Sequence, residues 1–168
     1  MKSLSLARPH ILILVGVPGA GKSFFAEHFS ETFGAPLISW NHLRYALFND
    51  PTYSEDEDAI IDRVAMLQLD ELIKTQTTLV YDGGTGTQAW RQDIVRAAKK
   101  AGYDVLYVWV QTDAATAEIR SLKQHVPPQV FERKTKKFTP LKSNDNHVVI
   151  SGKHTYASQL KIVLRRLS

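Results

Sequence analysis

The 168-residue sequence contains no cysteine, and this absence excludes two kinds of protein. Without thiols the chain can form neither a disulfide framework nor a thiolate metal site. The six histidines are scattered along the chain, and no pair of them has the spacing typical of metal ligands. We therefore interpret the histidines as ordinary residues rather than as metal ligands.

Long hydrophobic runs are absent as well. No apolar stretch approaches the ~20 residues that cross a bilayer, and the N-terminal residues MKSLSLAR are too short and too polar for a secretion signal. The sequence has no internal repeat and no low-complexity linker. With 43% hydrophobic and 23% charged residues, this pattern predicts a single globular domain over 1–168. We expect a cytoplasmic monomer that does not contact membranes.

Acidic residues are scarce in the C-terminal part. Residues 120–168 contain 11 Lys/Arg and 2 Asp/Glu, a net charge of +9, whereas residues 1–119 contain 10 and 15, a net charge of −5. A concentrated positive field favours a polyanionic ligand, such as nucleotide phosphates or a nucleic acid. A merely solvated basic surface is the alternative interpretation.

The most informative motif is GVPGAGKS at 16–23, a full match to the phosphate-binding pattern G-x-x-x-x-G-K-[S/T]. Its glycines allow backbone N–H groups to surround a phosphate, Lys22 can reach the β- and γ-phosphate oxygens, and the Ser23 hydroxyl suits Mg²⁺. The apolar run 10–15 precedes the motif and a helical pattern follows it, so a chance glycine turn is disfavoured. The residues expected to contact the nucleotide are Gly16, Pro18, Gly19, Ala20, Gly21, Lys22, Ser23 and Phe24.

Strand and helix patterns alternate along the chain, which predicts an α/β fold with a parallel sheet covered by helices on both faces. The expected strands are near 10–15, 36–39, 77–82, 105–110 and 148–150. The expected helices are near 22–33, 42–48, 55–75, 88–101, 113–124, 128–136 and 155–167. The acidic run 55–58 suits the N-terminal dipole of its helix, so we interpret it as structural rather than as a metal site.

Three further groups of residues are candidates for the site. Asp82 ends a buried strand, at the sheet edge where parallel sheets bind ligands, and suits Mg²⁺; capping of the next turn is its alternative role. Asn41 and Arg44 follow the second strand, where Arg44 can clamp a substrate phosphate or form a surface salt bridge. Arg120 and Lys123 begin a basic segment at about 120–140 that can close over ATP as a lid, or can simply be solvated.

The order of these motifs resembles the small P-loop kinases related to the polynucleotide 5′-kinase domain and the zeta-toxin kinases. The resemblance rests on GVPGAGKS, NHLR at 41–44, LVYDGG at 79–84 and the basic segment near 126–127, and it covers roughly residues 8–140. It implies a three-layer P-loop NTPase fold with strand order 2-3-1-4-5 and transfer of the ATP γ-phosphoryl group to a hydroxyl.

The same resemblance implies residue roles. Lys22, Arg44, Asp82 and Arg120 take catalytic positions, Ser23 and Asp82 hold Mg²⁺, and Asn41, Arg44 and Lys123 face the substrate. The family pattern after the second strand is D-D-x-R or D-x-x-R, in which the first Asp is the general base. This chain has Asn41 there.

General acid–base assistance contributes typically about 10²–10⁴-fold to rate, so the change to Asn41 matters. Three explanations are open: another carboxylate such as Asp50 replaces it, the substrate needs no strong base, or transfer is inefficient. The leading hypothesis is an ATP- or GTP- and Mg²⁺-dependent kinase acting on a nucleic-acid 5′ end, a nucleotide or a small metabolite. A nucleotide-binding regulatory module is the second hypothesis, and a simple ATPase is the third.

Overall fold

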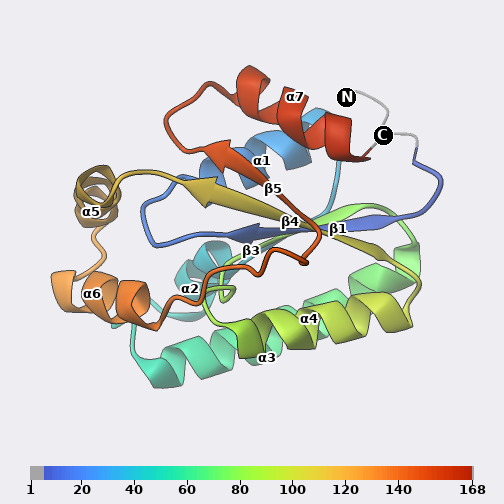
Figure 1. The fold of residues 1–168 in the computed structure, drawn as a ribbon. Helices are drawn as coiled ribbons and strands as arrows, with labels where there is room; N and C mark the ends of the chain where they lie inside the picture. Colours follow the sequence, from blue (N-terminus) through green and yellow to red (C-terminus); the bar gives the residue numbers. More distant parts are fainter. Residues whose placement is uncertain (1–5, 168) are drawn as a thin grey trace.

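A five-stranded sheet forms the middle layer of the protein (Figure 1). The structure is a computed structural model that describes residues 6–167; residues 1–5 and 168 of the expected domain lie outside the described residues. The strands are β1 (His10–Val15), β2 (Leu37–Ser39), β3 (Leu79–Asp82), β4 (Asp104–Gln111) and β5 (His147–Ser151). All four neighbouring pairs are parallel and the order is β2-β3-β1-β4-β5, which confirms the predicted topology.

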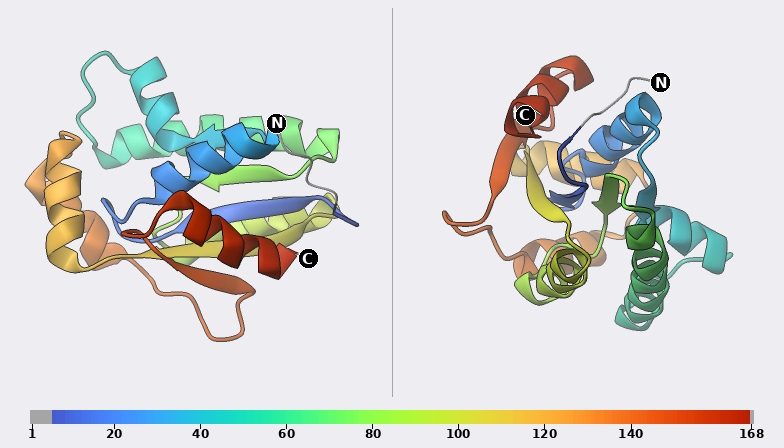
Figure 2. Two further views of the ribbon diagram at one scale, coloured as in Figure 1. Left: turned by 90° about the horizontal axis from the view of Figure 1, so that it is seen from above. Right: turned by 90° about the vertical axis from the view of Figure 1, so that its right-hand side faces the viewer.

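The helices lie on both faces of this sheet, as the end-on view shows (Figure 2). They are α1 (Lys22–Phe33), α2 (Trp40–Leu47), α3 (Glu55–Leu72), α4 (Gln88–Lys100), α5 (Ala114–Lys123), α6 (Pro128–Lys137) and α7 (Tyr156–Leu167). Helices α1 and α7 cover one face, and α3 and α4 cover the other (Figure 1). Because parallel sheets are buried on both sides, their strands are continuous apolar runs like β1.

The side chains of β1 divide the core into two halves. Ile11 and Ile13 pack with α3 and α4, whereas Leu12 and Leu14 pack with α1 and α7. This alternation follows from the two-residue period of a strand. All four side chains are completely buried, so β1 is the rigid base from which the GVPGAGKS loop emerges.

Some predicted boundaries shift in the structure. The expected helix 55–75 ends at Leu72 and continues as a 3₁₀ turn, Ile73–Thr75. The expected helix 42–48 begins at Trp40, because the Ser39 side chain caps it by accepting a hydrogen bond from the His42 N–H. The first position of that helix therefore lies directly beside the end of β2.

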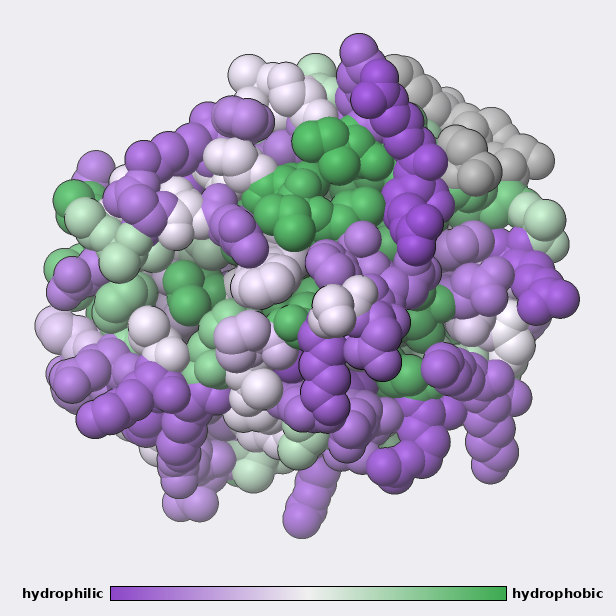
Figure 3. Space-filling view, in the orientation of Figure 1, coloured by the Kyte–Doolittle hydropathy of each residue, from purple (hydrophilic) through white to green (hydrophobic). Residues whose placement is uncertain are grey.

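The surface in the orientation of Figure 1 is mostly hydrophilic (Figure 3). An apolar area lies in its upper half, where β5 and α7 are found, and Val149 and Ile162 of these elements are exposed. None of the helices within residues 6–167 has the length and apolar character needed to cross a bilayer.

Candidate functional site

The GVPGAGKS loop connects the end of β1 to the start of α1 at the carboxyl edge of the sheet (Figure 1). Gly19 has φ +75°, and a Cβ there would lie 1.9 Å from the Ala117 carbonyl oxygen of α5. Only glycine fits this close approach. The N-cap of α1 is Gly21, which makes no side-chain cap, so the first N–H groups of α1 remain available to an anion.

Lys22 is folded back over this loop. Its Nζ donates hydrogen bonds to the carbonyl oxygens of Gly16 and Val17, at 2.9 and 2.8 Å. Burial lowers the pKa of Lys22, Asp82 opposes this effect, and Lys134 adds to it. A buried ammonium held only by neutral carbonyls favours an anionic ligand, and a phosphate fits that requirement.

Ser23 of α1 and Asp82 at the end of β3 are in contact at the carboxyl edge of the sheet. The Ser23 hydroxyl donates a 2.6 Å hydrogen bond to Asp82 Oδ2. Burial raises the pKa of Asp82, while Lys22 and the Ser23 hydrogen bond lower it. The Ser23 hydroxyl and the buried Asp82 carboxylate thus place two oxygen atoms side by side. This pair fits the ligand preference of Mg²⁺, which takes few protein ligands and completes its shell with phosphates and water. No cluster of three or more acidic or histidine ligands occurs within residues 6–167.

Arg120, predicted as a lid residue, lies beside the GVPGAGKS loop. Its Nη1 donates a 2.8 Å hydrogen bond to the Gly152 carbonyl and would lie 3.6 Å from a Cβ placed on Gly21. Lys123 is exposed in the last turn of α5, one turn beyond Arg120. The structure thus brings Arg120 to the GVPGAGKS loop, whereas the Lys123 side chain makes no hydrogen bond or ion pair within residues 6–167.

Gly152 is a site residue that sequence reasoning misses. A Cβ on Gly152 would lie 1.8 Å from the Ala20 carbonyl oxygen, so the connection after β5 touches the phosphate-binding loop directly. The only available signal was its place after the last strand, at the carboxyl edge where ligands bind. No local motif marks it.

Arg44 has a different environment from the one expected. It is buried, its Nη1 donates a 2.7 Å hydrogen bond to Glu57, its Nη2 pairs with Asp58, and its guanidinium lies 4.6 Å from the centre of the Tyr53 ring. Neither the substrate clamp nor the exposed salt bridge describes this arrangement. Arg44 instead joins α2 to α3, and Glu57 and Asp58 of the acidic run have a structural role as its partners.

Burial raises the pKa of Glu57, but hydrogen bonds from Thr52, Tyr53 and Arg44 outweigh it, so the pKa is lowered overall. This carboxylate is therefore ionised and fully partnered. Both terminal nitrogens of the Arg44 guanidinium are engaged by carboxylates and the side chain is buried, so a bidentate phosphate contact requires these ion pairs to open.

The basic segment at about 120–140, predicted as a lid, consists of the end of α5, the helix α6 and the residues up to 140. Three cations of α6 contact the α2–α3 side. Arg133 donates a 2.7 Å hydrogen bond to the Tyr53 carbonyl, Lys134 lies 3.2 Å from Asp58, and Lys137 pairs with Glu55. The lid is thus docked on the acidic start of α3.

The first residues of α2 differ in their exposure to solvent. Asn41 is exposed in the first turn of α2. Trp40 is buried and packs so closely on the loop after β3 that a Cβ on Gly84, at φ +61°, would lie 2.0 Å from its ring. Asp50 is exposed beyond the opposite end of α2, and an eight-residue helix is about 12 Å long. This separation from Asn41 does not favour Asp50 as the carboxylate that replaces the general base.

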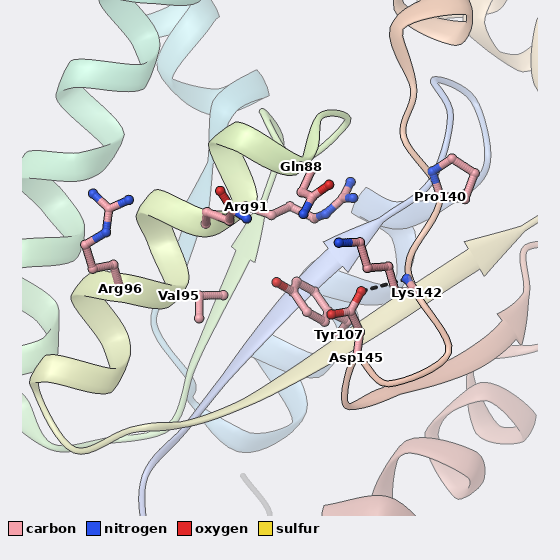
Figure 4. Close-up of a pocket in the computed structure, with 9 residues that line it drawn as sticks. Gln88, Arg91, Val95, Arg96, Tyr107, Pro140, Lys142 and Asp145 are labelled. Carbon is pink, nitrogen blue, oxygen red and sulfur yellow. Dashed lines mark hydrogen bonds between the residues drawn. The ribbon is translucent and has the colours of Figure 1, made fainter.

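A separate hollow of about 350 Å³ lies between α4, β4 and residues 140–145 (Figure 4). Arg91 lines it and donates hydrogen bonds to the carbonyls of Thr85 and Thr139, at 2.9 and 2.8 Å. None of the predicted nucleotide or substrate residues lines this hollow. Arg91 ties the loop after β3 to Thr139, near the end of the basic segment, which the sequence did not indicate.

The sheet order and the loop geometry define a P-loop NTPase-like protein. A family model described as an AAA domain matches residues 11–141, and the chain belongs to this family. A search of curated proteins finds no match. The P-loop kinase character expected from the sequence is supported at this level, while the closer resemblance to polynucleotide kinases and zeta toxins is not confirmed.

Solved structures share the fold at low identity. A protein of Chloroflexus aurantiacus to which a kinase function has been ascribed has a TM-score of 0.77 at 12% identity, over 96% of this chain and 100% of that one. A gluconokinase of Sinorhizobium meliloti has a TM-score of 0.68 at 15% identity, over 95% and 91%. An unliganded sugar kinase of Janibacter sp. has a TM-score of 0.70 at 12% identity, over 95% and 94%.

Proposed function

We propose that this protein is a kinase that transfers the γ-phosphoryl group of ATP or GTP to a hydroxyl. The observation that carries the proposal is the geometry of the GVPGAGKS loop: Lys22 is enclosed in its loop, and Ser23 is hydrogen-bonded to Asp82. The acceptor class covers a nucleic-acid 5′ end, a nucleotide or a small metabolite. The similarity to a gluconokinase and a sugar kinase adds sugars and sugar acids to the acceptors worth testing.

The chain's own residues would act mainly by positioning and by neutralising charge. Lys22 and the N–H groups at the start of α1 would hold the β- and γ-phosphates, with Arg120 at the side of the loop. Bound Mg²⁺, held by Ser23 and Asp82, would neutralise charge on the transferring group. The docked lid would exclude water, so that the acceptor hydroxyl rather than water receives the phosphoryl group.

The test is incubation with γ-labelled ATP and Mg²⁺ and a panel of acceptors: sugars, gluconate, nucleosides and an oligonucleotide with a free 5′-hydroxyl. Label moving to an acceptor is expected. Phosphate released only to water would point to an ATPase, and tight ATP binding without turnover would contradict the kinase. GTP in place of ATP measures base preference.

A nucleotide-binding regulatory module is the second candidate, because Asn41 has no carboxylate and Arg44 is held by Glu57 and Asp58. Its test is Asn41→Asp. If Asn41 has silenced a kinase, the restored carboxylate should raise transfer by up to about 10²-fold. Asn49→Asp, in the loop beyond α2, is the matched control. An unchanged rate would show that Asn41 is not the limiting defect.

A further inference from the structure

The first turn of α2 contains a second polar side chain, and its surroundings differ from those of Asn41. His42 Nε2 lies 3.5 Å from Glu27 Oε1 of α1. Its other ring nitrogen, Nδ1, has no hydrogen-bond partner among residues 6–167. His42 is thus paired at one nitrogen and open at the other, which is the arrangement of a histidine that can accept a proton.

The backbone holds His42 next to the phosphate site. Ser39 pairs in register with Asp82, and the Ser39 hydroxyl accepts a 3.2 Å hydrogen bond from the His42 N–H. The cap therefore fixes the first turn of α2 at the strand end that carries Asp82. His42 also lowers the pKa of Asp82, by less than Lys22 and the Ser23 hydrogen bond do.

Glu27 reaches the same place from the other side. It lies four residues after Ser23 on α1, so the two side chains share one face of that helix. Ser23 contacts Asp82, and Glu27 contacts His42 one turn further along. The acidic groups near His42 are therefore Glu27 from α1, which contacts the ring, and Asp82 from β3.

We propose that His42, oriented by Glu27, accepts the proton of the attacking hydroxyl in place of the carboxylate that Asn41 lacks. This role rests on the proposed kinase function. The acceptor oxygen bonds to the γ-phosphorus while the bond from that phosphorus to the β,γ-bridging oxygen breaks, and ADP or GDP leaves. The hydroxyl proton passes to His42 Nδ1, and the resulting imidazolium is neutralised by Glu27.

The geometry sets His42 apart from the other candidates. Asp50 lies past the far end of α2, and Asn41 has no atom that takes a proton at neutral pH. Asp82 is engaged with Ser23 at the predicted metal position. Glu27 is in direct contact with His42 and is a positioning residue, since it would act through the ring rather than on the hydroxyl itself.

The experiment compares His42→Gln, His42→Ala and Glu27→Gln with the unmodified protein. The readouts are phosphoryl transfer from γ-labelled ATP to the acceptor panel and to water, ATP affinity by titration, and melting temperature. We expect His42→Gln to lose about 10²–10⁴-fold in transfer rate with ATP affinity and melting temperature unchanged. Glu27→Gln should lose up to about 5-fold in kcat, with no change in KM for ATP. His10→Gln, at the opposite edge of the sheet, is the control.

Added imidazole should restore transfer in His42→Ala, because a free base can enter the space left by the ring. Rescue would not occur if the side chain only shaped the site, so its absence overturns the role as proton acceptor. An unchanged rate in His42→Gln overturns the proposal, as does a rate that falls together with ATP affinity and melting temperature.

Failure of the kinase itself has a different signature. An unmodified protein that binds ATP but transfers phosphate neither to any acceptor nor to water overturns the proposed function, and the role of His42 with it. An unmodified protein that transfers phosphate normally, alongside an equally active His42→Gln, overturns only the role of His42.

Discussion

At the scale of single residues, the site depends on two charges that burial disfavours. Burial lowers the pKa of Lys22 and raises that of Asp82, so each group is held in an environment that opposes its ionised form. Each partly offsets the other, and a bound triphosphate with its cation would add further opposite charge beside both groups. Such perturbed pairs are typical of functional sites and cost stability in the free protein.

Lys22→Ala should weaken ATP binding severely. Hydrogen bonds to charged groups contribute about 1.5–3 kcal/mol, which corresponds to about 10- to 150-fold in affinity. Titration of ATP with Mg²⁺ measures the change, and Lys74→Ala, an exposed lysine after α3, is the control. Equal ATP affinity in Lys22→Ala and the unmodified protein would contradict the assignment of the loop.

Asp82→Asn should stabilise the fold while it removes the Mg²⁺ dependence of ATP binding. A carboxyl with a raised folded-state pKa binds its proton more tightly when folded, so its contribution to stability is lost as pH rises through that pKa. The ionised Asp82 therefore costs stability at neutral pH, and the neutral amide avoids the cost.

Thermal unfolding should show a gain of about 0.5–2 kcal/mol for Asp82→Asn near pH 7 that shrinks as the pH is lowered. The exposed Asp104→Asn serves as control. A lower melting temperature at neutral pH would show that the carboxylate is a net stabilising group, contrary to this argument.

At the scale of elements, α2, α3 and α6 are held together by charge rather than by apolar packing alone. Arg44 of α2 pairs with Glu57 and Asp58 at the start of α3, and Lys134 and Lys137 of α6 contact the same end. Helices α6 and α2 therefore contact the same acidic residues at the start of α3. Moving α6 away from α3 requires separating Lys134 from Asp58. Asp58 would still be paired with Arg44 after this separation.

Arg44→Ala should reduce the unfolding free energy by about 3–5 kcal/mol, because it leaves two buried carboxylates without their main partner. Urea denaturation measures the change. The exposed Arg63→Ala of α3 should stay within about 0.5 kcal/mol. If Arg44→Ala kept its stability and instead raised the KM of an acceptor, the substrate-clamp hypothesis would be favoured over the structural role.

The elements themselves were largely predictable. The apolar run of β1 and the spacing on α3 and α4 follow directly from burial on one or two faces, and these elements lie where the sequence predicts them. The ends were less predictable, since the Ser39 cap that starts α2 at Trp40 depends on where β2 stops. The partner of Arg44 was not predictable, because any of several carboxylates at the sheet edge could have reached it.

At the scale of the whole molecule, the phosphate site is a meeting point of three distant segments. The GVPGAGKS loop, α5 with Ala117 and Arg120, and the connection after β5 with Gly152 are in contact. The parallel sheet with order β2-β3-β1-β4-β5 brings the last two beside the first, because β4 and β5 lie on one side of β1. The contacts among these three segments therefore help to fix the conformation of each of them.

Gly152→Ala should therefore change the conformation of the GVPGAGKS loop, although Gly152 lies about 130 residues from it in the sequence. A Cβ there would meet the Ala20 carbonyl at 1.8 Å, and relieving that clash must shift one of the two loops. We expect a loss of about 1–3 kcal/mol in unfolding free energy together with weaker ATP binding. Thermal unfolding and ATP titration measure both changes.

Gly86→Ala is the matched control, because a Cβ on Gly86 meets no atom within 4 Å. Equal ATP affinity in Gly152→Ala and Gly86→Ala would mean that the contact between the two loops does not shape the nucleotide site.

The sequence by itself determined the phosphate-binding loop, the alternation of strands and helices, and the position of Asp82 at a strand end. These features are local: a run of apolar residues predicts its own burial, and a set of glycines predicts a backbone that can adopt unusual conformations. The tertiary structure alone decided that Arg44 is occupied by Glu57 and Asp58, that Gly152 touches Ala20, and that His42 meets Glu27. Such contacts join residues whose separation along the chain says nothing of their distance, and only the packing of the sheet and its helices determines it.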